Sequence, residues 1–317
     1  MVSREVIERI ESIRLDERSG ARELSKKALL VLKFTLKTTE EETFQGILRE
    51  FNEVGRLLLQ ARPNMAPVRN LVAKAIYEVN ILRKGRKGWD SLILKELAIS
   101  RIDKLIKSSE LSLRKVSIHG ASLVMDFDVI ATCSYSSTLC EVFKVAKKEG
   151  KRFRVLVSES RSRGKAYGLF MAEKLDSYGI QVEVFPDYAI DEHLREAKKV
   201  FVGADSILPD GSLINGTPTY QLAQTSRGLN LPFFSICETS KFEVRHRGEL
   251  GIGEGFDLVP SDLITAIVTE IGVIEPSKVP LIAKQMEEYV RFVETLFSPK
   301  SLGAIGDLEG KSKGRAE

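Results

Sequence analysis

The sequence has few of the residues from which disulfide frameworks and metal centres are built. Only three cysteines and three histidines occur among 317 residues, and their spacing resembles no zinc-binding motif. No apolar run approaches the roughly 18 residues that a membrane-spanning helix needs. The N-terminus is charged and amphipathic, unlike a signal peptide. We therefore expect a cytoplasmic protein that has no membrane contact, no metal and no other cofactor.

Charge of a single sign is also lacking. The formal net charge is +4, from 48 Lys and Arg against 44 Asp and Glu. A surplus so small and so dispersed does not indicate direct nucleic-acid binding. The hydrophobic content of 43% is that of an ordinary globular protein, and a chain of this length has room for two domains.

Residues 1–124 show helical periodicities and no convincing strand. Apolar side chains recur at helical spacing within residues 6–13, 28–36, 44–58, 68–75 and 94–106. Pro67 is well placed to begin the fourth of these helices. We predict a helical N-terminal domain over residues 1–124.

From residue 125 the pattern changes to short apolar runs that alternate with helical segments. The runs are Val129–Ala131, Phe153–Val157, Val182–Phe185, Val200–Val202 and Phe233–Ile236. Such alternation is typical of a parallel sheet covered by helices. The predicted fold class is therefore α/β, with an N-terminal helical bundle followed by a Rossmann-like parallel-sheet domain over residues 125–297. Residues 298–317 are rich in Gly, Lys, Ser and acidic residues and are expected to be disordered.

Further helices are predicted between and after these runs. Lys165 to Tyr178 has a helical pattern, Thr217-Pro218 has the form of a cap followed by a first-turn proline, and Ser261 and Ser277 are expected to open two late helices in the same way.

The turn after the first predicted strand is crowded with hydroxyl groups. It contains Thr132, Ser134, Ser136, Ser137 and Thr138 and leads into a helical pattern. In a parallel sheet, ligands bind outside the carboxyl ends of the strands, where the next helix presents free N–H groups. This turn would suit an anion, phosphate above all. The alternative is an ordinary Ser or Thr helix cap.

Polar side chains follow three other strands at the same expected edge. Residues 158–165 contain Arg161, which would suit a phosphate or belong to a solvated basic loop. Asp205 follows Gly203-Ala204, so its carboxylate could accept a ligand hydroxyl, transfer a proton or cap a turn. Lys241 follows the last strand and is either a ligand-binding cation or an exposed lysine.

Two further residues are candidates with strong alternatives. Cys133 would be a nucleophile if a cation or helix terminus lowered its pKa, but no histidine is near in sequence and we favour a packed thiol. Arg62, before Pro63, is the best basic candidate in the helical domain. Its alternative is a surface arginine that ends a helix.

Together these residues resemble the family that contains the alpha, beta and delta subunits of translation initiation factor 2B. The same family includes isomerases that act on methylthioribose-1-phosphate and ribose-1,5-bisphosphate. The resemblance covers nearly all of residues 1–297. It implies a helical domain followed by a Rossmann-like domain, a homodimer or larger assembly, and translation initiation factor 2 as a candidate partner. The segments that carry it, in order, are Ser19-Gly20-Ala21, Arg62-Pro63, Asp128-Val129-Ile130, Ser158-Glu159-Ser160, Gly203-Ala204-Asp205, Asn215-Gly216-Thr217, Glu238-Thr239-Ser240-Lys241-Phe242 and Thr269-Glu270-Ile271-Gly272.

The departures from the family pattern fall on the residues of the isomerases. Those enzymes place a catalytic cysteine after a Thr-His pair and use the aspartate of Gly-Ala-Asp as its partner. Counting without gaps from Asp128, Cys133 falls on the histidine and Ser134 on the cysteine. A shift by one residue would restore Cys133 but would lose the matches of Thr132 and Ser136.

Two other isomerase residues are also replaced. Gly216 stands where the isomerases carry a lysine, and Ser19 stands in place of an arginine, although Arg18 is adjacent. A serine is a far weaker acid than a thiol, and no activating base is visible in the sequence.

The resemblance therefore implies a non-catalytic, initiation-factor-2B-like regulatory protein that binds a phosphorylated sugar or a nucleoside monophosphate. The alternative is an aldose–ketose isomerase of the ribose-1,5-bisphosphate type, in which Asp205 acts with Cys133 or Ser134. A ligand-free scaffold is a third reading. The expected ligand-binding residues are Arg62, Ser134, Ser136, Ser137, Arg161, Asp205, Asn215 and Lys241.

Overall fold

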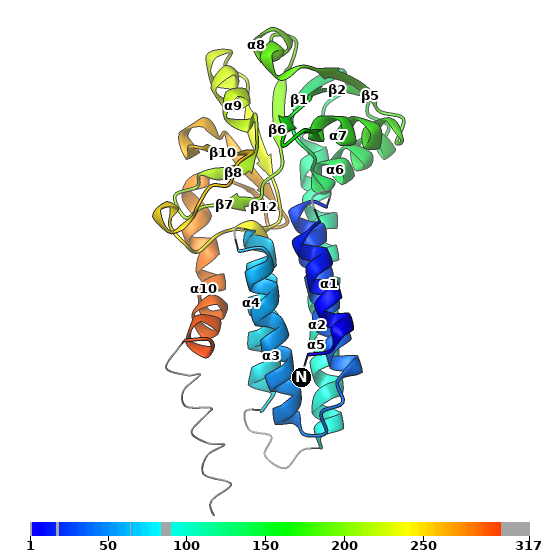
Figure 1. The fold of residues 1–317 in the computed structure, drawn as a ribbon. Helices are drawn as coiled ribbons and strands as arrows, with labels where there is room; N and C mark the ends of the chain where they lie inside the picture. The colour runs from blue at the N-terminus through cyan, green and yellow to red at the C-terminus, as the bar shows by residue number, and fades with distance from the viewer. Residues whose placement is uncertain (1, 17–18, 64, 84–89, 299–317) are drawn as a thin grey trace, which may run out of the picture.

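The computed structural model describes residues 2–16, 19–63, 65–83 and 90–298. A long helical body carries an α/β body at one end (Figure 1). The predicted helical periodicities all fall within helices, and Pro67 lies in the first turn of one of them. The tail that is predicted to be disordered lies, beyond residue 298, outside the described residues. The helices of the first body are α1 (Arg4–Arg14), α2 (Ala21–Thr38), α3 (Phe44–Ala61), α4 (Ala66–Asn80) and α5 (Ser91–Ser122).

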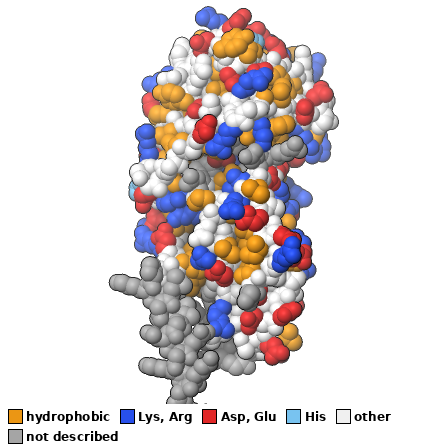
Figure 2. Space-filling view, viewed as in Figure 1, with side chains coloured by type: hydrophobic (Ala, Val, Ile, Leu, Met, Phe, Trp, Pro, Cys, Tyr) orange, Lys and Arg blue, Asp and Glu red, His pale blue; other side chains and the backbone are white. Residues whose placement is uncertain are grey.

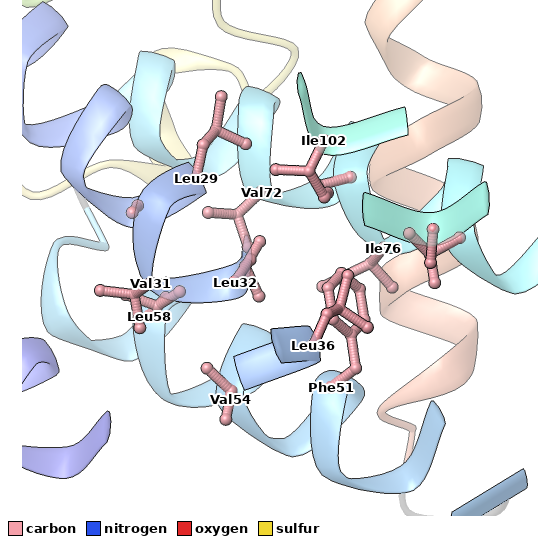
Figure 3. Close-up of a cluster of buried hydrophobic side chains, with 14 of the residues drawn as sticks. Leu29, Val31, Leu32, Leu36, Phe51, Val54, Leu58, Val72, Ile76 and Ile102 are labelled. Carbon is pink, nitrogen blue, oxygen red and sulfur yellow. The ribbon is translucent and has the colours of Figure 1, made fainter. Parts of the chain in front are cut away.

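The apolar stripes of these helices meet in one core (Figure 3). Burying each such large side chain contributes about 1.5–3 kcal/mol. Helix α10 (Val279–Leu296), near the end of the chain, adds Val290 and Val293 to the same cluster. Fully buried members of the core include Leu32, Leu36, Phe51, Leu58, Val72 and Ile76.

The predicted parallel sheet is present, with seven strands in the order β12-β11-β9-β6-β1-β2-β5. The five predicted runs form neighbouring parallel strands. A sixth parallel strand, β11, and an antiparallel edge strand, β12, complete the sheet. The bounds are β1 (Asp128–Thr132), β2 (Phe153–Ser158), β5 (Gln181–Phe185), β6 (Lys199–Val202), β9 (Phe233–Ile236), β11 (Ala266–Thr269) and β12 (Gly272–Ile274).

Helices cover both faces of this sheet. On one face, α5 packs with α6 (Ser137–Lys148) and α7 (Tyr167–Asp176) around a core that includes Phe143. On the other, α8 (Ile190–His193), α9 (Thr219–Gly228) and α10 pack around a second core that includes Leu222. Both faces are buried, as expected for parallel strands that read as continuous apolar runs.

Helix α5 joins the two bodies. It is 32 residues long, or about 48 Å at the rise of an α-helix. Its first half contributes Leu94 and Ile102 to the helical core. Its last turns contribute Val116 and Ala121 to the core beneath the sheet.

Several local predictions were wrong. The helix predicted from Lys165 begins at Tyr167, because β3 (Arg161–Ser162) pairs with β4 (Lys165–Ala166) in a hairpin. Helix α9 has Pro218 rather than Thr217 at its N-cap position, since the Thr217 hydroxyl donates to Asp257 instead. Ser261 opens only a 3₁₀ turn, and Ser277 lies in a 3₁₀ turn ahead of α10.

The remaining elements are short. A small antiparallel sheet of three strands, which the sequence did not reveal, lies beside α9 and contributes to the cleft described below. Its strands are β7 (Ser206–Ile207), β8 (Leu213–Gly216) and β10 (Phe256–Val259). The 3₁₀ turns are η1 (Ile81–Arg83), η2 (Asp187–Ala189), η3 (Thr239–Lys241), η4 (Arg247–Glu249), η5 (Ser261–Leu263) and η6 (Pro276–Lys278).

The visible face of both bodies carries mixed charge. In Figure 2, Lys and Arg side chains are interspersed with Asp and Glu over the visible face, and neither sign dominates a region. None of the helices within the described ranges is long and apolar enough to cross a membrane.

Candidate ligand-binding cleft

Two adjoining cavities lie where the carboxyl ends of β1 and β6 meet the start of α2. Asp205 and Tyr135 line both, so we treat them as one cleft with an inner and an outer end. The inner end is about 30 Å³, and its side chains are Arg22, Ser136, Ser137, Asn215 and Lys241. The outer end is about 130 Å³, and its lining residues include Arg62, Ser134, Arg163, Gly216 and Phe256.

Lys241 gives the inner end its chemical character. The residue is only 4% exposed. Its backbone is fixed in the 3₁₀ turn η3, where its N–H donates to the carbonyl of Glu238 at 3.0 Å. Within the described part of the chain, its ammonium group makes no hydrogen bond and no ion pair. Withdrawing a charge from water costs several kcal/mol per ion unless a partner is present. This arrangement favours an anion in the inner end.

The N-terminus of α6 faces the same space. Ser136 is its N-cap, and the Ser136 hydroxyl accepts the N–H of Leu139 at 3.3 Å. Ser137 occupies the first helical position and lines the cavity with a neighbouring N–H group. Free N–H groups and the positive end of the helix dipole add to the attraction for an anion. Gly203 permits this close approach, because a Cβ there would lie 2.7 Å from the Ser136 hydroxyl.

Arg22, in the first turn of α2, is a second cation at the inner end. Its Nε lies 3.5 Å from a carboxylate oxygen of Glu238, which is 3% exposed. The contact is too long for a good hydrogen bond, and both the Arg22 Nε and the second Glu238 oxygen are buried without a partner. The pair is therefore loosely bound and leaves hydrogen-bonding capacity beside the cavity.

Asp205 lies between the two ends, as the position after a strand predicts. Its backbone N–H donates to Ile214 at 2.9 Å, which anchors the loop to strand β8. The side chain is partly buried. Burial raises the pKa of Asp205, although the nearby charge of Lys241 acts in the opposite direction. The carboxyl group is therefore easier to protonate than in water, which reduces its repulsion of an anion.

Ser134 lies at the outer end and shares the cavity with Asp205. It has a left-handed backbone conformation, with φ of 60°. Its N–H donates to the Ser160 hydroxyl at 2.6 Å. A Cβ at Gly216 would lie 2.7 Å from the Ser134 hydroxyl oxygen. The two positions are therefore spatially coupled, since a side chain at 216 requires Ser134 to move.

The loop beneath Ser134 is organised by Asp187, in η2. The Asp187 carboxylate accepts the hydroxyl of Ser158, the N–H of Ser160 at 2.7 Å and the N–H of Arg161 at 2.8 Å. Ser160, which is held in this way, accepts the N–H of Ser134. Asp187 thus orients the wall of the cleft without lining it.

Cys133 points away from the cleft. The residue is 1% exposed and belongs to the core on the other side of β1. Its Sγ lies 3.1 Å from the hydroxyl of Thr219. Burial raises the pKa of the Cys133 thiol to about 12, so the thiolate is scarce at neutral pH. The geometry matches the packed thiol that the sequence favoured.

The structure does not bring Arg161 to the cleft. The hairpin of β3 and β4 turns its side chain outward, where the exposed guanidinium pairs with Glu159 at 2.7 Å. Arg163, at the tip of the same hairpin, lines the outer end instead and donates to the carbonyl of Glu254 at 2.6 Å. The predicted loop does reach the cleft, but through Arg163, which lies in the turn between β3 and β4 with a left-handed φ of 51°, and not through Arg161 in β3.

Two other expected ligand residues have structural partners. The Arg62 guanidinium donates to the carbonyl of Ile13 at 3.0 Å and to that of Asp16, so it ties the end of α1 to the cleft wall. The Asn215 amide donates to the Thr219 hydroxyl at 2.9 Å. Both residues still line the cleft.

Arg22, Arg163 and Asp187 were missed as site residues. Arg22 directly follows the Ser19-Gly20-Ala21 segment, which could have identified it; Arg18, considered instead, lies outside the described residues. No sequence signal marks Asp187. Across the described ranges, no cluster of three His, Cys, Asp or Glu side chains could hold a metal ion.

The fold and cleft define an α/β protein with a polar, partly cationic cleft at the carboxyl edge of a parallel sheet. The chain belongs to the Initiation factor 2 subunit family, whose model matches residues 17–254. This establishes the family resemblance found in the sequence.

Relatives within the family carry two kinds of name. A ribose 1,5-bisphosphate isomerase of Methanocaldococcus jannaschii is 32% identical over 295 residues, covering 85% of this chain and 91% of that protein. A Pyrococcus furiosus protein described as translation initiation factor eIF-2B subunit 2-like is 30% identical, covering 88% and 99%. Sequence similarity therefore does not choose between a regulatory protein and an isomerase.

Solved structures confirm the fold class. The translation initiation factor eIF-2B of Pyrococcus horikoshii superposes with a TM-score of 0.74 at 28% identity, covering 87% of this chain and 99% of that one. The 5-methylthioribose 1-phosphate isomerase of the same organism has a TM-score of 0.70 at 22% identity, covering 89% and 87%. At that identity the second likeness shows the fold alone.

Proposed function

We propose that this chain is a translation initiation factor 2B-like regulatory protein that binds a phosphorylated sugar or nucleotide without converting it. The observation that supports this most directly is Lys241, a residue only 4% exposed whose ammonium group makes no hydrogen bond or ion pair with the described protein. It lines the inner end of the cleft together with the N-terminal turn of α6. A phosphoryl group would supply the negative charge and the hydrogen-bond acceptors that this end lacks.

The outer end supports binding without conversion. Ser134, which occupies the position of the isomerase cysteine in the ungapped alignment, shares the cavity with Asp205. A serine hydroxyl needs an activating base to transfer protons, and no described side chain forms a hydrogen bond with it. The one thiol nearby, Cys133, is packed in the core. Of the three residues expected to be catalytic in an isomerase, a sugar phosphate would thus meet Asp205 and Ser134 but not Cys133.

Isothermal titration calorimetry with ribose-1,5-bisphosphate and AMP tests this function. We expect saturable binding by the wild-type protein and no formation of ribulose-1,5-bisphosphate when the mixture is followed by ³¹P NMR. Lys241→Met should weaken binding by roughly 10–100-fold, because charge-assisted hydrogen bonds contribute about 1.5–3 kcal/mol.

Lys144→Met is the matched control. Lys144 lies on α6 but away from its N-terminus, where it pairs with Glu141 at 3.2 Å. This variant should bind both compounds like the wild type. Absence of any heat or NMR shift with either compound would contradict the ligand-binding proposal.

An isomerase remains the second candidate, and Asp205 favours it. Its pKa is raised by burial, which is the adjustment that a general acid–base carboxyl group requires. Turnover of ribose-1,5-bisphosphate by the wild-type protein, together with its loss in Asp205→Asn, would establish this function and overturn the proposal above.

A further inference from the structure

The first turns of α4 contact several segments that supply the cleft. The N–H of Ala66 is 3.4 Å from the hydroxyl of Ser206, the residue after Asp205. The amide of Asn70 donates to the carbonyls of Ser240 at 2.8 Å and Phe242 at 2.7 Å, the two neighbours of Lys241. Asn70 is itself fully buried. A side chain from the helical body thus fixes the backbone on both sides of the buried lysine.

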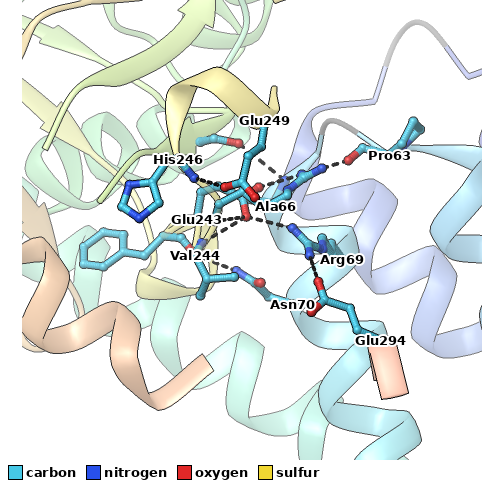
Figure 4. A network of polar contacts seen from close by, with 12 residues as sticks. Pro63, Ala66, Arg69, Asn70, Glu243, Val244, His246, Glu249 and Glu294 are labelled. Atoms are coloured by element: carbon cyan, nitrogen blue, oxygen red, sulfur yellow. Dashed lines mark hydrogen bonds and ion pairs between the residues drawn. The ribbon is translucent and has the colours of Figure 1, made fainter. Parts of the chain in front are cut away.

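A buried charge network extends this attachment (Figure 4). Glu243 is 0% exposed, two residues after Lys241. Its carboxylate accepts Arg69 of α4 at 3.0 Å and Arg245 at 2.7 Å. Arg69 also donates to Glu294 of α10 at 2.9 Å. Arg245 donates to the carbonyl of Pro63, beside Arg62, at 2.9 Å.

The arginines around Glu243 keep its carboxylate charged. Burial acts to raise the pKa of Glu243, but the hydrogen bonds and charges of Arg245 and the charge of Arg69 outweigh it and lower the pKa below its usual value. The group therefore stays ionised near neutral pH. A buried pair of this kind constrains geometry strongly, because separating the partners leaves an uncompensated charge.

Beside these contacts, the segment that carries Lys241 meets the helical body through Arg22 and Glu238, 3.5 Å apart, and is held in its own body by Thr239, whose N–H and hydroxyl donate to Glu270 at 2.9 and 2.5 Å. It is a 3₁₀ turn of three residues, a type of structure with weak hydrogen-bond geometry of its own. The side chain of Lys241 projects into the cleft without a protein partner. The position of the ammonium group therefore depends on how firmly the turn is held.

We propose that Asn70 and the Arg69–Glu243 pair are positioning residues that hold Lys241 in the inner end of the cleft and so set the affinity for a phosphoryl group. This inference rests on the proposed ligand-binding function and adds to it. Affinity is then governed in part by α4, a helix of the other body that supplies no side chain to the inner end.

A double-mutant cycle on the full chain tests the proposal, because it separates action through Lys241 from a general structural effect. Dissociation constants for ribose-1,5-bisphosphate and inorganic phosphate are measured for wild type, Asn70→Ala, Lys241→Met and the double variant. We expect Asn70→Ala to weaken binding roughly 10-fold, equivalent to about 1.4 kcal/mol. In the Lys241→Met background the same change should alter affinity less than about 2-fold.

Asn80→Ala is the matched control. Asn80 lies at the other end of α4, where it exchanges hydrogen bonds of 3.1 and 2.7 Å with Asn52. Its loss removes similar bonds from the same helix and should leave both dissociation constants unchanged. If Asn70→Ala fails to fold, Arg69→Lys carries the test, since lysine keeps the charge but cannot span both Glu243 and Glu294. We expect roughly 3-fold weaker binding, again only when Lys241 is present.

The two ways in which this could fail are distinguishable. If the wild-type protein binds neither probe, the ligand-binding function and this inference fall together. If Lys241→Met weakens binding while Asn70→Ala has no effect, or has the same effect in both backgrounds, the positioning role is wrong and the ligand site stands.

Discussion

The inner and outer ends of the cleft differ in the side chains that they present. The inner end has a buried lysine, a second cation and a helix N-terminus around a small space. The outer end is larger and has Ser134 and Gly216 where the isomerases of the resemblance carry a cysteine and a lysine. One end carries two cations, and the other differs from the isomerase pattern of the resemblance at two positions.

Under the proposed function, binding and conversion depend on separable parts of the fold. Holding an anion needs fixed charges and N–H groups, which the sheet edge and α6 supply through backbone geometry. Conversion needs a group with a suitable pKa next to the reacting atoms. A change of two side chains can remove the second ability while leaving the first.

Replacing a glycine by alanine at each end in turn should give the largest difference in ligand affinity between the two ends. Gly203→Ala places a Cβ 2.7 Å from the Ser136 hydroxyl and 2.9 Å from its Cβ. Overpacking of this kind costs about 1–3 kcal/mol, so we expect ligand affinity to fall roughly 10-fold by calorimetry.

Gly216→Ala is the paired change at the outer end. Its Cβ meets mainly the Ser134 hydroxyl, which can rotate away, whereas the Ser134 Cβ is 3.3 Å distant. We expect affinity to change by less than about 3-fold, because one rotamer change costs little compared with displacement of a helix cap. Equal losses in the two variants would remove the distinction between the ends.

Asp205, which lines both ends of the cleft, should lower the free energy of unfolding at neutral pH. Because its folded pKa lies above the ordinary value, the stability linked to this group is full at low pH and declines as the pH rises through the folded pKa. Asp205→Asn removes a partly buried charge and should raise the unfolding free energy by roughly 1 kcal/mol at pH 7 in the absence of ligand.

Thermal melts of Asp205→Asn and wild type across a pH series measure this effect. The advantage of the variant should shrink as the pH falls toward 3.8, the ordinary value for an aspartate. A variant that is less stable than the wild type at pH 7 would show that the carboxylate is held by favourable contacts, contrary to its geometry.

Cys133 gives the smallest expected effect on binding. Cys133→Ala leaves a small void in the core behind β1 and should cost about 1 kcal/mol of stability, measured by chemical denaturation. Ligand affinity should change by less than about 2-fold, since the thiol does not line the cleft. A loss of isomerase turnover in this variant would instead give the thiol a catalytic role.

The broad arrangement could be predicted because it depends on periodicity. The five apolar runs became adjacent parallel strands, and their following loops gathered at one edge, as topology requires. Strand β11 was missed because its three apolar residues, Ala266–Val268, are too short a run to distinguish a strand from another kind of element. The small sheet of β7, β8 and β10 consists of two- to four-residue strands with no readable alternation.

The finer features of the cleft depend on contacts that the sequence does not encode locally. Arg161 and Arg163 are equivalent as residues, and only the β3–β4 hairpin decides that the second faces the cavity. Arg69 and Glu243 are 174 positions apart and meet only through the packing of α4 against the α/β body. Cys133 and Ser134 differ by one position and both follow the end of β1, yet Cys133 packs into the core whereas Ser134, with its left-handed backbone, lines the cleft.

Helix α5 has a consequence for how the cleft is shaped. This continuous helix packs into a different hydrophobic core at each end. The two bodies therefore cannot swing apart about it without disrupting one of these cores. The width of the cleft is thus established when the chain folds. We therefore expect a ligand to enter a preformed space and not to draw the two bodies together around itself.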